Sequence, residues 1–182
     1  MTIQKRQFIF ETQQFTRVQY LKDILGRLES EAGTIFECFK QHNAKSEGKT
    51  GFWAGIRLLM PVVESVAKAV DKTPWQLLED DLDINTGNLV WQMFRHSLIH
   101  GDLLRHVKYG TQTVGWGLMM MGQGHIIKKN HIGLDLYTLY DKLVEFLKSE
   151  IAKNDQTIIE VNVGINYTNP EQYIIDDFNK LK

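Results

Sequence analysis

The stretch that decides the fold is Val90-Trp91-Gln92-Met93-Phe94-Arg95-His96-Ser97-Leu98-Ile99-His100-Gly101-Asp102. Spaced at about 100° per residue, its side chains predict a helix with two stripes on opposite sides. The first stripe consists of Val90, Trp91, Phe94 and Leu98 and is wide enough to seat the helix in a core. The second consists of Leu89, Met93, His96 and His100. Because a surface helix needs only one apolar stripe, the second predicts a face turned towards a cleft, a ligand or a partner chain.

Basic residues gather at the end of this helix. Gly101 follows the predicted helix directly, as a glycine in the left-handed conformation does at a helix C-terminus. His100 therefore lies near the negative end of the helix dipole, which favours the protonated imidazole. Residues 95–108 contain three cations and three histidines against a single acidic residue, Asp102; they are Arg95, Arg105, Lys108, His96, His100 and His106. We expect Arg105, His106 and Lys108 to bind phosphate, with Lys128, Lys129 and His131 extending the patch. Such a patch gives sequence-independent affinity for phosphates.

Composition excludes several classes of protein. The chain has 182 residues, 43% hydrophobic and 24% charged, and its 21 Lys and Arg nearly balance its 22 Asp and Glu. No global field attracts a polyanion, so contact with one needs a local patch. Cys38 is the only cysteine, which excludes an internal disulfide and predicts a reducing compartment, and we expect its thiol to be buried. The N-terminus lacks the apolar core of a signal peptide, and no apolar run reaches a membrane span. We therefore expect a cytoplasmic protein without membrane contact.

Helical periodicity dominates the first half of the chain. Apolar spacing predicts a long helix from Phe15 to about Gln41 and a second over 52–70, with a kink or restart at Pro61. Thr73-Pro74 predicts the start of a short helix. The acidic run at 79–83 fits a solvated turn better than a metal site. The motif helix then starts at Asn85 or Thr86.

The second half mixes strands and helices. Alternation over 113–120 and 125–128, broken at Gly122-Gln123-Gly124, predicts a β-hairpin. A helix follows over 136–151 with Asp135 as its cap, then a strand over 159–167 and a helix after Asn169-Pro170. The sequence thus predicts a mainly α fold. We expect a helical domain over 1–154 with a hairpin insert at about 107–130, and a C-terminal strand–helix extension over 155–182 packed on the same domain.

The motif Arg95-His96-Ser97-Leu98-Ile99-His100 resembles that of the HEPN superfamily, in which Arg is followed by a polar residue and, four to six residues after the Arg, by His. The order of helices over roughly 13–153 is similar as well. The resemblance implies a helical bundle that dimerises with two motif helices facing each other. In active members this forms a metal-independent endoribonuclease; a toxin of this kind has an antitoxin-type partner protein.

Carried over by this resemblance, His100 is the general base towards a ribose 2′-hydroxyl or the general acid towards the leaving oxygen. Arg95 holds the scissile phosphate, and His96 is an auxiliary polar residue. The chemistry requires only a base of near-neutral pKa and a charge clamp, so we expect neither a metal ion nor a cofactor. Arg95 and His100 project about 140° apart on the helix. A two-fold homodimer relieves this, because Arg from one chain meets His from the other.

Two alternatives remain open at this point. One is a catalytically silent homodimer that binds nucleotides or RNA, or serves as a scaffold, because fold does not decide function. The other is a zinc site at His96 and His100, whose i, i+4 spacing lets two imidazoles share an ion. However, the sequence lacks the Glu of the His-Glu-x-x-His pattern. It also lacks a phosphate-binding Gly-Lys-Ser/Thr loop, a Gly-x-Ser-x-Gly elbow and a dinucleotide-binding fingerprint.

Overall fold

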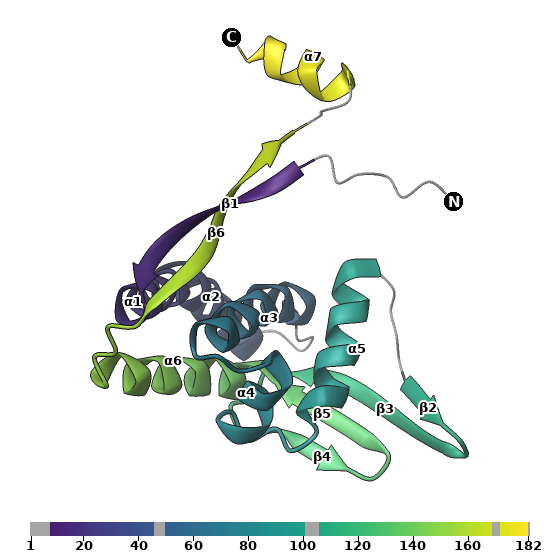
Figure 1. Ribbon diagram of the computed structural model, residues 1–182. Helices are drawn as coiled ribbons and strands as arrows, with labels where there is room; N and C mark the ends of the chain where they lie inside the picture. The colour runs from purple at the N-terminus through teal and green to yellow at the C-terminus, as the bar shows by residue number, and fades with distance from the viewer. Residues whose placement is uncertain (1–7, 46–49, 101–105, 169–171, 182) are drawn as a thin grey trace. The chain divides into compact units, whose positions relative to one another are not determined.

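The computed structural model describes residues 8–45, 50–100, 106–168 and 172–181, and for residues 95–100, 173, 174 and 178 it describes the backbone alone. The chain divides into two compact units. The larger unit comprises Arg17–Gln156, and the smaller comprises Met1–Thr16 with Thr157–Lys182. Each unit is described by itself below (Figure 1).

The larger unit opens with a continuous helical segment, as periodicity predicted. It consists of α1 (Arg17–Arg27), a π-helical stretch η1 (Leu28–Gly33) and α2 (Thr34–Lys45). The wider π turn shifts the phase of the buried stripe. Phe36 is consequently 3% exposed while its neighbour Ile35 is 36% exposed. The expectation of a buried thiol at Cys38 is wrong: Cys38 lies two residues beyond Phe36, on the exposed side of α2.

Helix α3 (Phe52–Ala69) forms the centre of the core. Its Ile56, Leu59, Val63 and Val66 are all fully buried. The helix continues through Pro61 without a restart. It packs against α1, α4, α5 and α6, so the helical part of the unit is assembled around it.

The short helix α4 (Pro74–Asp80) begins at the capping box that the sequence predicted. The Thr73 side chain accepts a hydrogen bond from the backbone N–H of Gln76, and the Gln76 side-chain oxygen accepts one from the backbone N–H of Thr73. In the acidic run that follows, Asp81 pairs with Lys72 and Asp83 pairs with Lys142. These ion pairs fit the solvated-turn interpretation. Helix α5 (Gly87–His100) then starts within two residues of its predicted position.

A four-stranded sheet corrects the prediction of a mainly α bundle, because helix accounts for 56% and strand for 25% of the structure. The strands are β2 (His106–Tyr109), β3 (Gln112–Met119), β4 (Ile126–Lys128) and β5 (His131–Asp135). Their order is β2-β3-β5-β4. The fold is therefore mixed α/β.

The predicted hairpin between 113–120 and 125–128 does not form. Instead β3 pairs antiparallel with β2 and parallel with β5, and β4 pairs with β5. Gly122 and Gly124, with φ of 66° and 92°, turn the chain away from β3. The strand that follows, β4, does not come back to pair with β3. Alternation identified the strands, but it carries no information on which strands pair.

Asp135 joins the sheet to helix α6 (Leu136–Ala152). Its side chain is fully buried and accepts four backbone N–H bonds. Oδ1 takes those of Tyr137 and Thr138 at 3.1 Å each, the predicted helix cap. Oδ2 takes those of Met121 at 3.1 Å and Gln123 at 3.4 Å. One carboxylate therefore holds both the first turn of α6 and the loop that leaves β3.

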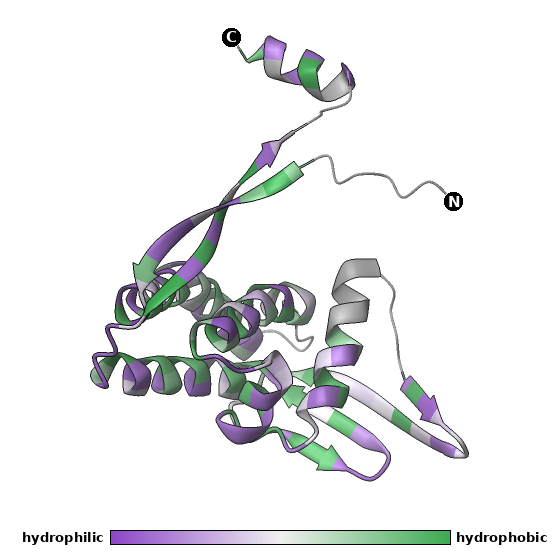
Figure 2. Cartoon of the chain, in the orientation of Figure 1, coloured by the Kyte–Doolittle hydropathy of each residue, from purple (hydrophilic) through white to green (hydrophobic). Residues whose placement is uncertain are grey.

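The smaller unit is built on a two-stranded antiparallel ribbon of β1 (Phe8–Thr16) and β6 (Ile158–Tyr167). Strand β6 confirms the predicted strand, whereas β1 was not predicted. Figure 2 shows hydrophilic and hydrophobic residues alternating along β6, whereas β1 begins with an apolar run that a polar run follows. Helix α7 (Gln172–Lys180) confirms the predicted final helix. The predicted extension over 155–182 thus has an additional strand from the N-terminus.

Among the described residues, no helix combines the length and the apolar character needed to cross a bilayer.

Candidate nucleic-acid interface

The first half of α5 is firmly seated in the larger unit. Val90 and Phe94 are fully buried and Trp91 is 5% exposed. The Phe94 ring contacts Trp116 of β3 edge-on at a centroid distance of 4.8 Å, and Trp53 of α3 contacts the same Trp116 at 5.9 Å. This aromatic contact lays α5 and α3 against one face of the sheet.

The stripe predicted to face a ligand or partner is partly covered. Met93 is 1% exposed. Leu89 lines a groove of about 380 Å³ together with Val114, Ile127 and Ile132 of the sheet. Met93 therefore packs within the chain, whereas Leu89 forms part of a groove wall.

The motif residues follow on the same helix. The backbone of Arg95, His96 and His100 is helical, and His100 is the last residue of α5 that the structure describes. Their side chains lie outside the described residues, and so does all of Arg105. The distance between Arg95 and His100 across a homodimer stays a prediction.

Strand register places four of the other predicted phosphate-binding residues on one sheet face, while Lys129 lies in the turn between β4 and β5. His106 of β2 is paired with Gly115 of β3, Gly115 with His131 of β5, and His131 with Lys128 of β4. Paired residues point to the same side of a sheet, and so do residues two apart on a strand, which adds Lys108. We call His106, Lys108, Lys128 and His131 the basic face. All four are exposed.

The basic face is the side of the sheet opposite α5. Val114, Trp116 and Ile132 alternate with the basic-face positions and point towards α5 and α3. On the basic face, a Cβ placed at Gly117 would meet only the Cε1 atom of His131, at 3.9 Å. The sheet backbone at Gly117 is therefore open to a ligand lying across the strands.

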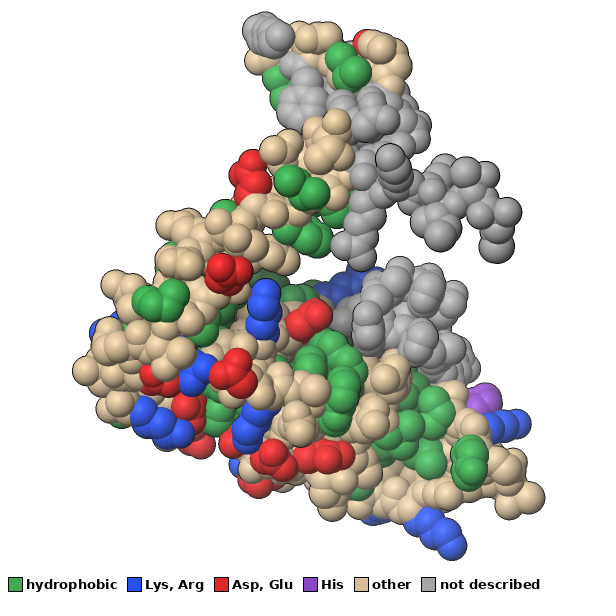
Figure 3. Space-filling model, in the orientation of Figure 1, with side chains coloured by type: hydrophobic (Ala, Val, Ile, Leu, Met, Phe, Trp, Pro, Cys, Tyr) green, Lys and Arg blue, Asp and Glu red, His purple; other side chains and the backbone are tan. Residues whose placement is uncertain are grey.

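Charge across this sheet is of one sign. The sequence contains no Asp or Glu from Leu103 to Leu134. Asp135 ends the sheet, but it is buried and its carboxylate accepts four N–H bonds. In the view of Figure 3, basic side chains and a histidine are visible over the strands and no acidic side chain lies among them. Phosphate groups complement such a surface.

Strand β2 is an edge strand of the sheet, and it is the first strand after α5 in the chain. Only residues 101–105 separate His100 from His106, which limits the distance between their Cα atoms to about 22 Å. Tyr109 of β2 is 90% exposed and offers an aromatic ring at this edge. A ligand that rounds the edge from the basic face would pass Tyr109.

The sequence predicted most of these residues to bind phosphate, but it predicted a single patch that also contained Arg95 and His100. The structure separates the basic face from the seated half of α5 by the thickness of the sheet. The signal that could have marked the sheet as a unit is the acid-free interval 103–134. In the described part of the chain, no three His, Cys, Asp or Glu side chains gather to hold a metal ion.

Comparisons with protein-family models, with curated proteins and with solved structures find no match to this chain.

Proposed function

We propose that this protein binds single-stranded RNA across the basic face and cleaves it at the end of α5. The observation that carries the proposal is the strand register, which puts two histidines and two lysines on one exposed, acid-free sheet face. Cα atoms of neighbouring strands lie about 5 Å apart, so the row from His106 to Lys128 spans about 15 Å. An extended phosphodiester backbone can follow such a row.

Single-stranded RNA is favoured over a duplex by the shape of this surface. An open sheet face contacts splayed nucleotides, and aromatic side chains stack on bases irrespective of sequence. Tyr109 would provide the stacking partner where the strand rounds the β2 edge. Beyond that edge, the Cα atom of His100 is at most about 22 Å from that of His106, so an RNA strand continuing past β2 would have only that distance to cross.

Cleavage is the second part of the proposal and rests on the Arg95–His100 motif. The 2′-oxygen attacks the adjacent phosphorus and the bond to the 5′-oxygen breaks, leaving a 2′,3′-cyclic phosphate and a 5′-hydroxyl. His100 of one chain accepts the 2′-hydroxyl proton, and His100 of a second chain protonates the leaving oxygen. Arg95 stabilises the charge that develops on the phosphate.

The test of binding uses fluorescence anisotropy with a labelled single-stranded RNA. We expect Lys108→Glu/Lys128→Glu to weaken binding by about a hundredfold, from the loss and reversal of two phosphate contacts. Lys22→Glu is the matched control, because Lys22 is an exposed lysine on α1. Equal affinities of the Lys108/Lys128 variant and the wild type would overturn the proposal.

The test of cleavage uses the same RNA in the presence of EDTA. We expect 2′,3′-cyclic phosphate ends with the wild type and none with His100→Ala, while the affinity of His100→Ala for RNA stays unchanged. Binding without any cleavage by the wild type would remove the nuclease part and leave the silent RNA-binding module.

A further inference from the structure

We propose that a cleft between α2 and α6 binds an aliphatic diamine or polyamine. The cleft has a volume of about 620 Å³, within the range of small-molecule sites. It lies on the larger unit and shares no residue with the basic face, so this proposal is independent of RNA binding.

Aromatic rings form the floor of the cleft. Phe36 of α2 stacks on Tyr140 of α6 at a centroid distance of 5.3 Å and contacts Tyr137 edge-on at 5.8 Å. Methylene groups pack favourably on such rings. An ammonium group above a ring face is attracted by its π electrons. The floor therefore suits a ligand that combines apolar segments with positive charge.

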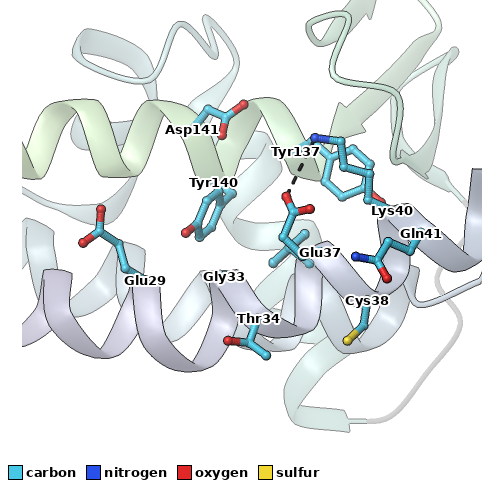
Figure 4. A pocket seen from close by; sticks show the side chains of 11 residues that line it. Glu29, Gly33, Thr34, Glu37, Cys38, Lys40, Gln41, Tyr137, Tyr140 and Asp141 are labelled. Carbon is cyan, nitrogen blue, oxygen red and sulfur yellow. Dashed lines mark ion pairs between the residues drawn. The ribbon is translucent and has the colours of Figure 1, made fainter.

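Carboxylates surround this floor at separate points. Figure 4 shows Tyr140 between Glu29 and Glu37, with Asp141 on the α6 side of the cleft. The cleft lining carries these three carboxylates against the single ammonium group of Lys40. Its charge complements a cationic ligand.

Two of the three carboxylates form ion pairs with lysines, and the third forms none with any described residue. Glu29 pairs with Lys148 at 2.8 Å and Glu37 with Lys40 at 3.8 Å, all four side chains being at least 45% exposed. Asp141 forms no ion pair with any described residue. Burial raises the pKa of the Asp141 carboxyl, opposed by Lys40 and reinforced by Glu145. A cation next to Asp141 would relieve this penalty.

The spacing of the charges distinguishes an extended cation from a metal ion. Within the described residues, no three acidic, cysteine or histidine side chains converge enough to ligate one ion. A diamine instead places its two ammonium groups at different carboxylates while its methylenes cover the rings. This distribution of charge is what the separated acids of the cleft can match.

Gly33 provides a way to perturb the cleft without altering its charge. A Cβ at Gly33 would stand 2.7 Å from the hydroxyl of Tyr140, so Gly33→Ala forces the Tyr140 ring to move. Gly26 is the matched control, because it lies on the same helical segment and a Cβ there meets nothing within 4 Å. Removing the hydroxyl as well, in Gly33→Ala/Tyr140→Phe, leaves the ring carbon at 3.6 Å, an ordinary contact.

The experiment is isothermal titration calorimetry of the full chain, free of nucleic acid, with 1,4-diaminobutane. Butane-1,4-diol serves as the uncharged control. We expect saturable binding of the diamine and none of the diol. Asp141→Asn should weaken diamine binding by about tenfold or more, the usual effect of losing a hydrogen bond to a charged group.

The glycine variants then test whether binding occurs at this cleft. We expect Gly33→Ala to weaken diamine binding, Gly26→Ala to leave it unchanged, and Gly33→Ala/Tyr140→Phe to recover part of it. Lys108→Glu/Lys128→Glu should bind the diamine like the wild type. The proposal is overturned by absence of diamine binding, by equal binding of the diol, or by unchanged affinity in both Asp141→Asn and Gly33→Ala.

Discussion

Replacing Asp135 tests how the sheet and the helical layer of the larger unit are joined. In Asp135→Ala, α6 loses its cap, which costs about 1 kcal/mol. The N–H groups of Met121 and Gln123 lose a charged acceptor, at about 1.5–3 kcal/mol each when taken singly. Because these losses overlap, we expect a total decrease of about 3–5 kcal/mol in the free energy of unfolding.

Asp135→Asn separates the two contributions. The amide oxygen of Asn still caps α6, but its NH2 group faces the N–H donors of Met121 and Gln123. We expect a decrease of about 2–3 kcal/mol, measured by urea denaturation followed by circular dichroism. Hydrogen exchange should accelerate at Met121 and Gln123 and stay unchanged at Tyr137 and Thr138. An Asp135→Ala protein within about 1 kcal/mol of the wild type would refute this reasoning.

Three further predictions concern single side chains. Burial lowers the pKa of His125, so the unfolded chain binds a proton at His125 more tightly than the folded chain does. Stability therefore falls as pH drops through the unfolded value of about 6.5. In urea denaturation, His125→Gln should lose less stability than the wild type between about pH 7.5 and pH 5.5. Gly33→Ala should lower the thermal midpoint relative to Gly26→Ala, and Tyr140→Phe in the same chain should restore it, because only the Tyr140 hydroxyl is crowded. Cys38 is exposed, so a thiol reagent should modify it in the native protein as fast as in urea.

Each of the three has a contrary result. A His125→Gln protein with the same pH dependence as the wild type would place the proton uptake elsewhere. Equal thermal midpoints for the two glycine variants would contradict the close approach of Tyr140 to Gly33. Modification of Cys38 only after unfolding would support the buried thiol that the sequence predicted.

Local signals in the sequence predicted the helices well. The capping residues Thr73 and Asp135 mark helix starts because their side chains bond N–H groups two or three residues away. The apolar spacing of α3 predicted its buried face, since that pattern needs no knowledge of the partner. These features depend on neighbours along the chain, which a single sequence contains.

Which strands pair depends on residues that are far apart in the chain, and the pairing predicted from the sequence was wrong. Strand β1 begins with consecutive apolar residues, Phe8-Ile9-Phe10, which do not alternate. Strand β5 has Gly133 at its centre, which weakens a strand pattern. Without β5, the nearest alternating segments were joined into a hairpin. The pairing that brings His131 beside Lys128, and both into line with His106, could then not be foreseen.

The sequence predicted which types of residue make up the candidate site, but it did not predict how they are arranged. Excess positive charge after α5 was visible from Arg105, His106 and Lys108. That His106 and Lys108 lie on the sheet face opposite the seated half of α5 follows only from the register of β2 and β3. The motif pair Arg95 and His100 remains a prediction from the sequence.

The salt dependence of RNA binding tests the central claim most directly. Each phosphate contact on a single strand contributes about 0.7 to the slope of log affinity against log salt. We predict that Lys108→Gln/Lys128→Gln lowers the magnitude of that slope by about 1.4, while Lys22→Gln leaves it unchanged. The same slope for the Lys108/Lys128 variant and the wild type would contradict the assignment of the basic face as the RNA-binding surface.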